Sequence, residues 1–233
     1  MRTDCRLIVA LDVDTEGEAL RIAGSLGEAV EWVKVGHQLF TRHGPDIVRR
    51  LRDTGRKVFL DLKFHDIPNT VARAVRSAAA TGASLTNVHA SGGRSMLTAA
   101  AEAGAEEGID VVAVTVLTSL DAEELGEVGW GDTPDDQVVR LARLTQDTGC
   151  CGVVCSAREI APVRAACGPA FRLVVPGIRP AGTAAGDQKR VMTPGEAVRA
   201  GADYIVVGRP ITKAPDPAKA AAGIRSEMAA AAG

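Results

Sequence analysis

The segment KVFLDLK, residues 57–63, is an apolar run that ends with two charged side chains close together. Successive residues of a β-strand point to opposite faces. Every second residue from Val58 to Leu62 therefore lies on one apolar face, whereas Phe59, Asp61 and Lys63 lie on the other. Helices cover apolar strand faces in α/β proteins. The segment thus predicts a strand that packs its apolar face against helices and turns its charged face away from them.

Runs of this kind recur along the chain, and each is followed by a stretch compatible with a helix. Eight such units in succession predict a closed parallel barrel. A hydrophobic fraction of 46% with only 3% aromatic residues fits a core of small aliphatic side chains, and no Pro/Gly/Ser-rich linker divides the sequence. We therefore expect residues 1–233 to form one (β/α)8 TIM-barrel domain. The expected strands cover residues 7–13, 30–36, 57–63, 84–90, 110–117, 152–157, 172–178 and 204–210.

Capping residues and glycines indicate the helix boundaries. Short polar side chains cap helix N-termini, and glycine commonly ends a helix. These signals predict helix starts at Asp14-Thr15, Asn69-Thr70 and Thr193-Pro194, helix ends at Gly55, Gly82 and Gly201, and a last helix from Pro217 onward.

Composition limits the classes of partner and location. The formal charge is −2 and the isoelectric point is near 6.1, so the chain has no global basic field for nucleic acid or an anionic membrane. The N-terminal apolar run is too short for a signal sequence, and no stretch approaches the roughly 18 apolar residues of a membrane span. We expect a cytoplasmic protein. The five cysteines lack paired CxxC spacing, which predicts buried thiols rather than disulfides or a metal site.

Strand alternation brings further charges to one end of the barrel. It points Asp12 of the first strand and Lys34 of the second inward, beside Asp61 and Lys63, and Asp66 follows closely. Buried charges persist only where they neutralise one another. We therefore expect an alternating network of all five at the C-terminal mouth, where barrel enzymes place their chemistry. A solvated ring of ion pairs that closes the barrel end is the alternative interpretation.

A second polar cluster follows the last two strands. Arg179 lies in PGIRP, a glycine-containing loop continues to Gln188, and Gly208 and Arg209 lie in VVGRP. Backbone N–H groups of a glycine turn and an arginine fork together form a phosphate site, which barrels commonly build at this place. The loop is poor in apolar side chains, which favours a mobile segment that closes over the phosphate. A simple turn with a surface arginine is the alternative for the Gly-Arg pair.

Other polar residues near strand ends allow less specific predictions. Thr118 and Ser119 can hydrogen-bond a ring amide, and the lack of a nearby base in the sequence argues against a nucleophile. His65 and His89 could take part in acid–base chemistry. Packing or hydrogen-bonding roles are favoured for both.

Taken together, these motifs resemble the orotidine 5′-phosphate decarboxylase family in its bacterial form. The DxKxxD motif of Asp61, Lys63 and Asp66 is shared by a wider group of barrels, whereas the joint occurrence of all the blocks in order is specific. The resemblance spans the whole chain. The blocks are LDV at Asp12, VKVG at Lys34, DLKFHDIPNTV at 61–71, HASGG at 89–93, TVLTS at 115–119, PGIRP at 176–180, DQ at 187–188 and VVGRPIT at 206–212.

The resemblance implies a decarboxylase that needs neither a metal nor an organic cofactor and converts orotidine 5′-monophosphate to uridine 5′-monophosphate in pyrimidine biosynthesis. Lys63 is then the proton donor, flanked by Asp61 and Asp66 in a charged network with Lys34. The family works as a homodimer in which the residue matching Asp66 reaches into the partner's site. The other implied substrate contacts are Asp12 and Lys34 to the ribose, Asp61 near the substrate carboxylate, Thr118 to the pyrimidine, Arg179, Gln188, Gly208 and Arg209 to the phosphate, and Ile67 and Thr70 beside Asp66.

Two other functions remain open from the sequence. A sugar-phosphate decarboxylase or aldolase of the same wider group shares the DxKxxD motif but uses a divalent metal to stabilise an enediolate. A non-catalytic sensor of a phosphorylated ligand could also use a barrel scaffold. The presence of Lys63 argues against the sensor, because a binder has no use for a proton donor held between carboxylates.

Overall fold

The computed structural model describes residues 5–28, 30–131, 133–180 and 192–232 of the chain. Within these ranges eight parallel strands form a closed barrel, in which each strand pairs with the next and the eighth pairs with the first. The single-domain (β/α)8 TIM barrel predicted from the sequence is therefore confirmed. The strands are β1 (Arg6–Ala10), β2 (Trp32–Gly36), β3 (Lys57–Phe64), β4 (Leu85–His89), β5 (Asp110–Val114), β6 (Gly152–Val154), β7 (Arg172–Val175) and β8 (Tyr204–Val207).

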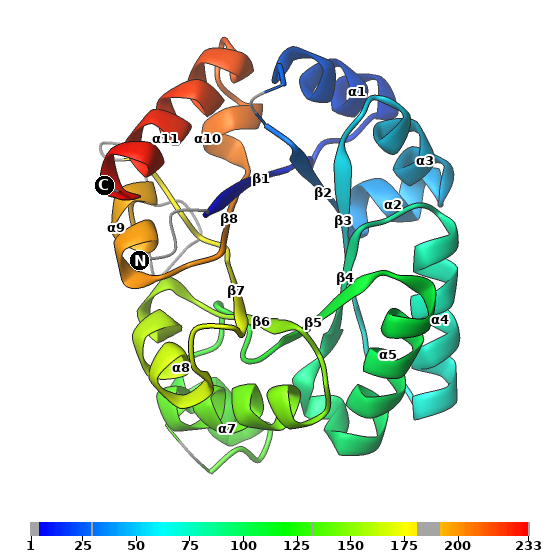
Figure 1. Cartoon of the computed structure of the whole chain (residues 1–233), viewed down its shortest axis with the longest axis vertical. Coiled ribbons are helices and arrows are strands. Elements are labelled where there is room, and N and C mark those ends of the chain that lie inside the picture. The colour runs from blue at the N-terminus through cyan, green and yellow to red at the C-terminus, as the bar shows by residue number, and fades with distance from the viewer. Residues whose placement is uncertain (1–4, 29, 132, 181–191, 233) are drawn as a thin grey trace.

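The helices form an outer ring around the strands (Figure 1). The connections after β2, β5 and β8 each carry more than one helix. The helices are α1 (Glu16–Ser25), α2 (His37–His43), α3 (Asp46–Asp53), α4 (Pro68–Ala80), α5 (Gly93–Glu107), α6 (Ala122–Glu127), α7 (Pro134–Asp147), α8 (Ile160–Cys167), α9 (Pro194–Ala200), α10 (Arg209–Thr212) and α11 (Pro217–Ala232), with 3-10 turns at Ala90–Gly92 and Ala157–Glu159.

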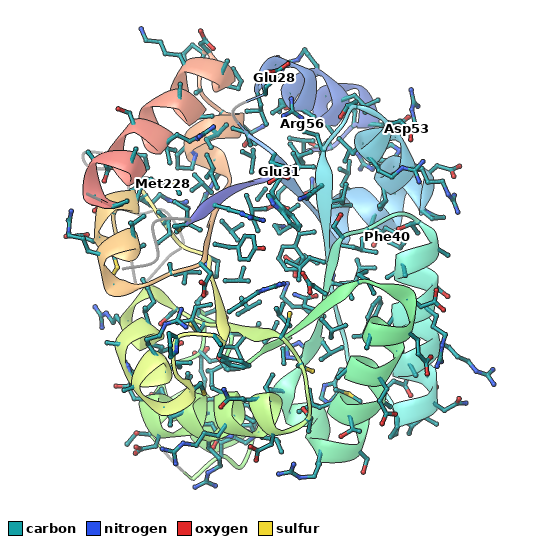
Figure 2. The ribbon with its side chains drawn as sticks, in the orientation of Figure 1. Glu28, Glu31, Phe40, Asp53, Arg56 and Met228 are labelled. Atoms are coloured by element: carbon teal, nitrogen blue, oxygen red, sulfur yellow. The ribbon has the colours of Figure 1, made fainter. Side chains whose placement is uncertain are left out.

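Alternating strand residues build two apolar layers. Phe59 of β3 belongs to an inner layer enclosed by the strands, together with Ile8 and Trp32. Its neighbours Val58 and Leu60 belong to the outer layer between strands and helices. Figure 2 shows side chains filling the space inside the ring of strands. The inward face of β3 predicted from KVFLDLK is therefore correct, and the barrel interior is a packed core rather than a channel.

Most of the predicted helix boundaries are correct. Thr15 caps α1 by accepting a hydrogen bond from the backbone N–H of Glu18, and Thr193 caps α9. The predicted start at Asn69-Thr70 is wrong, because α4 already begins at Pro68. Proline suits the first helical position, where its missing N–H would have no intrahelical partner and its φ is already helical. Glycines with positive φ follow helix ends as predicted, at Gly55, Gly82 and Gly201.

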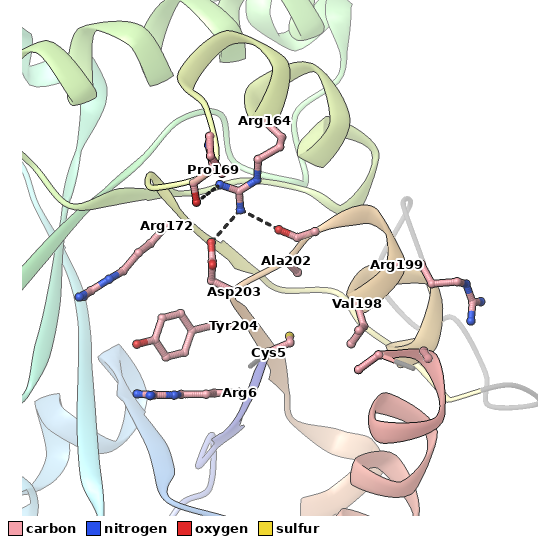
Figure 3. Close-up of a pocket in the computed structure, with 13 residues that line it drawn as sticks. Cys5, Arg6, Arg164, Pro169, Arg172, Val198, Arg199, Ala202, Asp203 and Tyr204 are labelled. Atoms are coloured by element: carbon pink, nitrogen blue, oxygen red, sulfur yellow. Dashed lines mark hydrogen bonds and ion pairs between the residues drawn. The ribbon is translucent and has the colours of Figure 1, made fainter. Parts of the chain in front are cut away.

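The N-terminal end of the barrel is held by arginine side chains. Arg164 of α8 donates to the carbonyl of Gly201 and to the carboxylate of Asp203, both in the turn between α9 and β8 (Figure 3). A cavity of about 730 Å³ lies here, lined among others by Arg6 and Tyr204. This end of a TIM barrel serves stability rather than catalysis. We therefore assign a structural role to the arginine contacts, in spite of the size of the cavity.

Two predictions from composition concern the cysteines and membrane spans. All five cysteines are free thiols, and Cys150, Cys155 and Cys167 are buried as predicted, whereas Cys5 and Cys151 are partly exposed. Burial raises the pKa of Cys150 to about 11, so this thiol stays protonated at neutral pH. In the described ranges no helix is both long enough and apolar enough to cross a membrane.

Candidate active site

Four charged side chains meet at the C-terminal mouth of the barrel, as strand alternation predicted. Lys34 of β2 lies between two carboxylates, with its Nζ 2.9 Å from Asp12 Oδ1 and 3.3 Å from Asp61 Oδ2. Lys63 Nζ lies 2.6 Å from the other oxygen of Asp61. The order Asp12, Lys34, Asp61, Lys63 alternates in sign, so the row is neutral as a whole.

Mutual compensation keeps the buried members of this row charged. Lys34 is only 8% exposed. Burial disfavours its ammonium form, but the carboxylates of Asp61 and Asp12 outweigh burial and raise the Lys34 pKa. Burial likewise disfavours the ionised form of Asp61, but Lys34 and Lys63 outweigh it and lower its pKa to about 2. Both groups are therefore ionised at neutral pH.

Gly36 leaves room for the Lys34 ammonium. A Cβ atom at this position would lie 2.9 Å from Lys34 Nζ and 3.1 Å from Asp12 Oδ1. The Lys34 ammonium would therefore have to shift and the Asp12 carboxylate would have to give way slightly, so a side chain at this position would disturb the ion pair. This role of Gly36 was not predicted, although a glycine in a strand is a signal for close approach.

A backbone irregularity in β3 presents Lys63 to the mouth. The pairing of β3 with β4 shifts register between Leu60 and Phe64. Lys63 lies in this interval and has a φ of 50°, the only positive φ of a non-glycine residue in the described ranges. Conformations of this kind typically cost roughly 1–3 kcal/mol and persist where the surrounding structure holds them, often at functional sites. Asn87 of β4 accepts a hydrogen bond from the Lys63 N–H at 2.8 Å.

Asp66 lies outside the row of charges. It is exposed, and one of its carboxylate oxygens accepts a hydrogen bond from the Ile67 N–H at 2.6 Å. No ion pair of Asp66 is found among the described residues. The network of five predicted for one chain therefore has four members. The reason is that the chain turns outward after β3, so that Asp66, Ile67 (66% exposed) and Thr70 lie on the surface at the start of α4.

A cavity of about 180 Å³ opens beside the charged row. Lys34, Asp61 and Lys63 line one part of it, and Thr118, the residue expected to contact a pyrimidine, lines another. The rest of the wall is largely apolar, a feature that the sequence analysis missed because its side chains come from separate strands. These wall residues are Phe59, Val114, Val116, Leu117, Val154, Cys155, Pro176 and Val206.

The predicted phosphate residues are only partly described. Arg179 follows β7 and is buried, and its guanidinium donates to the Ile178 carbonyl at 3.3 Å. Gly208 follows β8 and lies beside the mouth, since a Cβ atom there would lie 4.0 Å from Asp12 Oδ2. Arg209 is exposed and begins α10. Gln188 and most of the loop predicted to close over the phosphate lie outside the described residues.

Two histidines stand next to the charged row. The rings of His65 and His89 are 5.5 Å apart between centroids. Burial, then His65 and Lys63, lower the pKa of His89. His89 is therefore neutral at pH 7 and adds no charge to the mouth. Among the described residues no group of three or more His, Cys, Asp or Glu side chains is arranged to hold a metal ion.

This arrangement can stabilise negative charge on a bound molecule and supply a proton to it. The Lys63 ammonium is fixed by Asp61 at the edge of a partly apolar cavity, where electrostatic interactions are stronger than in water. Together with the closed barrel, the charged mouth is typical of an enzyme that works at the C-terminal ends of barrel strands.

The chain belongs to the orotidine 5′-phosphate decarboxylase / HUMPS family, whose model matches residues 5–224. A protein named orotidine 5′-phosphate decarboxylase from Anaeromyxobacter sp. (strain K) is 57% identical over 228 residues, which cover 98% of this chain and 100% of the relative. One of the same name from Photobacterium profundum is 50% identical over 97% of this chain and 99% of its own. The crystal structure of orotidine 5′-phosphate decarboxylase from Lactobacillus acidophilus matches with a TM-score of 0.86 and 39% identity, covering 97% of this chain and 99% of that chain. The family resemblance and the prediction of a decarboxylase enzyme are thereby confirmed.

Proposed function

We propose that the chain decarboxylates orotidine 5′-monophosphate to uridine 5′-monophosphate, a step of pyrimidine biosynthesis carried out in the cytoplasm. The observation that carries this proposal is the Lys63 ammonium, held 2.6 Å from Asp61 at the edge of a cavity with an apolar wall. Relatives named for this activity share about half of their residues with the chain over nearly its full length.

In the proposed reaction the bond between the pyrimidine ring and its carboxylate breaks, and the electron pair stays on the ring carbon as CO₂ leaves. The ring offers no electron sink in its plane, so the negative charge must be stabilised by the protein. The Lys63 ammonium is the cation placed for this task, and its proton then forms the new C–H bond. Lys63 regains a proton from solvent, so the enzyme returns to its starting state.

Asp61 contributes through its negative charge. Its pKa of about 2 keeps it ionised, so a substrate carboxylate bound nearby would be repelled before the bond breaks and less so afterwards. Favourable contacts at the distant phosphate, assigned to Arg179, Gln188, Gly208 and Arg209, can offset this repulsion. Asp12 and Lys34 are assigned to the ribose hydroxyls, and Thr118 to the pyrimidine.

The proposed reaction uses no metal and no organic cofactor, and this separates it from that of the metal-dependent sugar-phosphate enzymes. The test is to mix the purified protein with orotidine 5′-monophosphate and excess EDTA and to follow the ultraviolet absorbance change of decarboxylation. We expect full activity in EDTA. Activity that requires added divalent metal, or no turnover of this substrate, would contradict the proposal.

We also propose a homodimer with shared active sites. The support is the exposed position of Asp66, with the large apolar side chain of Ile67 beside it on the same surface. A residue that points away from its own barrel can complete the site of a partner related by two-fold symmetry.

Subunit exchange tests the shared site. Lys63→Ala and Asp66→Ala proteins, each inactive alone, are mixed and allowed to exchange. If Asp66 acts in the partner's site, a mixed dimer has one doubly altered site and one intact site, so about a quarter of all sites recover under random pairing. Verified exchange without recovered activity would refute the shared site and leave the decarboxylase proposal in place.

A further inference from the structure

Asn87 of β4 joins the two parts of the mouth that carry the proposed chemistry. Its side-chain Nδ2 donates to Asp61 Oδ1 at 2.7 Å, and its Oδ1 accepts from the backbone N–H of Lys63 at 2.8 Å. The residue is only 1% exposed, so water does not readily replace either bond. It does not line the cavity itself.

An amide is the group that this place requires. One end must donate to a carboxylate and the other must accept from a backbone N–H, and the asparagine side chain offers both. A carboxylate at this position would face Asp61 with like charge. An aliphatic side chain would leave the Lys63 N–H without its acceptor inside the register shift of β3.

Asp61 is fixed from several sides through this contact. Its Oδ1 accepts from both Asn87 Nδ2 and Lys63 Nζ, and its Oδ2 faces Lys34. The same amide holds the backbone of Lys63 at its positive φ. One side chain therefore sets both the orientation of the Asp61 carboxylate and the starting point of the Lys63 side chain.

We propose that Asn87 is a positioning residue for the decarboxylation, which holds Lys63 and Asp61 in the arrangement that proton delivery requires. The inference rests on the proposed function. Because Asn87 is not proposed to contact the substrate, removal of its side-chain amide should slow the chemical step and leave substrate binding nearly unchanged.

The matched control is Thr86, the preceding residue of the same strand. Thr86 is fully buried and its Oγ1 donates to the Leu60 carbonyl of β3 at 3.0 Å. It therefore makes the same kind of cross-strand bond to β3, but on the face away from the charges. Thr86→Val removes this bond without touching the site, and should lower stability while leaving kcat and KM at wild-type values.

Kinetics of Asn87→Ala and Asn87→Asp give the first readout. For Asn87→Ala we expect kcat to fall roughly tenfold to a hundredfold, because the variant loses a buried hydrogen bond to a charged group and misplaces the reacting lysine. KM should change less than about threefold. Asn87→Asp has nearly the same shape, so it guards against a variant that fails to fold. At pH 7 the kcat of Asn87→Asp should be at least as low as that of Asn87→Ala. Its kcat should recover in part at lower pH, because the carboxyl introduced at position 87 and that of Asp61 then share a proton.

The second readout does not depend on activity. The other charged groups near Asp61 are Lys34 and Lys63, and His89 lies close by on β4. All three remain in Asn87→Ala, so the loss of the amide alone should raise the Asp61 pKa. Carboxyl ¹³C NMR titration measures this, with the Asp61 signal assigned by Asp61→Asn.

The outcomes separate the two claims. The positioning role would be overturned if a folded Asn87→Ala protein kept the wild-type kcat, or if its kcat fell no further than that of Thr86→Val. It would also be overturned if the Asp61 pKa did not change. If wild type and Thr86→Val both fail to decarboxylate orotidine 5′-monophosphate, the proposed function is wrong, and the titration still decides whether Asn87 positions Asp61.

Discussion

Replacing Lys34 by methionine should destabilise the protein in a way that depends on pH. The substitution keeps most of the side-chain volume but removes the ammonium between Asp12 and Asp61. In the wild type, folding lowers the pKa of Asp61 from 3.8 to about 2, which corresponds to about 2 kcal/mol of stability at neutral pH. Because the folded-state pKa is the lower one, this contribution is complete above about pH 5 and is lost as the pH falls toward 2.

In Lys34→Met the balance at Asp61 changes. Burial still disfavours its ionised form, and the strongest opposing charge is gone. The contact with Asp12 matters less, because the Asp12 side chain is 53% exposed and solvent screens it. We therefore expect the free energy of unfolding of Lys34→Met to be about 2–3 kcal/mol below that of the wild type at pH 7. Near pH 3 this difference in free energy should decrease to about 1 kcal/mol.

Urea titrations of both proteins at the two pH values measure this difference. Arg76→Met is the control, since Arg76 pairs with Glu106 on the surface, with both side chains more than two-fifths exposed. Such a pair contributes about 0–1 kcal/mol. Two results would contradict the expected effect of Lys34→Met. One is a loss in free energy of unfolding at pH 7 no larger than that of Arg76→Met, and the other is a loss that stays the same when the pH is lowered.

Two further substitutions test other parts of the mouth. Gly36→Ala would bring a Cβ to 2.9 Å from Lys34 Nζ, so we expect a folded protein whose kcat/KM falls about tenfold or more, and a variant with wild-type kinetics would contradict the close-approach argument. Arg209→Ala should lower kcat/KM for the phosphorylated substrate by about 1.5–3 kcal/mol and barely change the slow reaction of the phosphate-free nucleoside, because the lost contact is charge-assisted and absent in the nucleoside. Equal losses on both substrates would speak against a phosphate contact.

The fold and most of the charged row follow from short-range rules. Alternation in KVFLDLK separates Phe59, Asp61 and Lys63 from the helix-packed face, and the structure shows this separation. The same rule places Lys34 correctly, because β2 is regular up to Gly36. Period-two reasoning works here because a one-residue slip of β3 would turn Asp61 and Lys63 toward the apolar helices, so its register is strongly specified.

Features that depend on contacts between distant segments could not be predicted. The positive φ of Lys63 arises where β3 and β4 shift register, and no local residue preference signals it. Asn87 in TNVHA looks like an ordinary polar residue of a strand, and only the barrel brings it to Asp61. The start of α4 at Pro68, by contrast, was open to prediction, because proline suits the first helical position, and this local signal was overlooked.

The most direct test of the central claim is the rate of decarboxylation by Lys63→Ala. Lys63 is proposed both to stabilise the ring carbanion by its charge and to supply the proton. The kcat of this variant should therefore fall at least a thousandfold, which corresponds to a rise of about 4 kcal/mol or more in the activation barrier. Circular dichroism and thermal melting establish that the variant is folded. A folded Lys63→Ala protein that keeps more than about a tenth of the wild-type rate, a loss below about 1.4 kcal/mol, would show that another group delivers the proton.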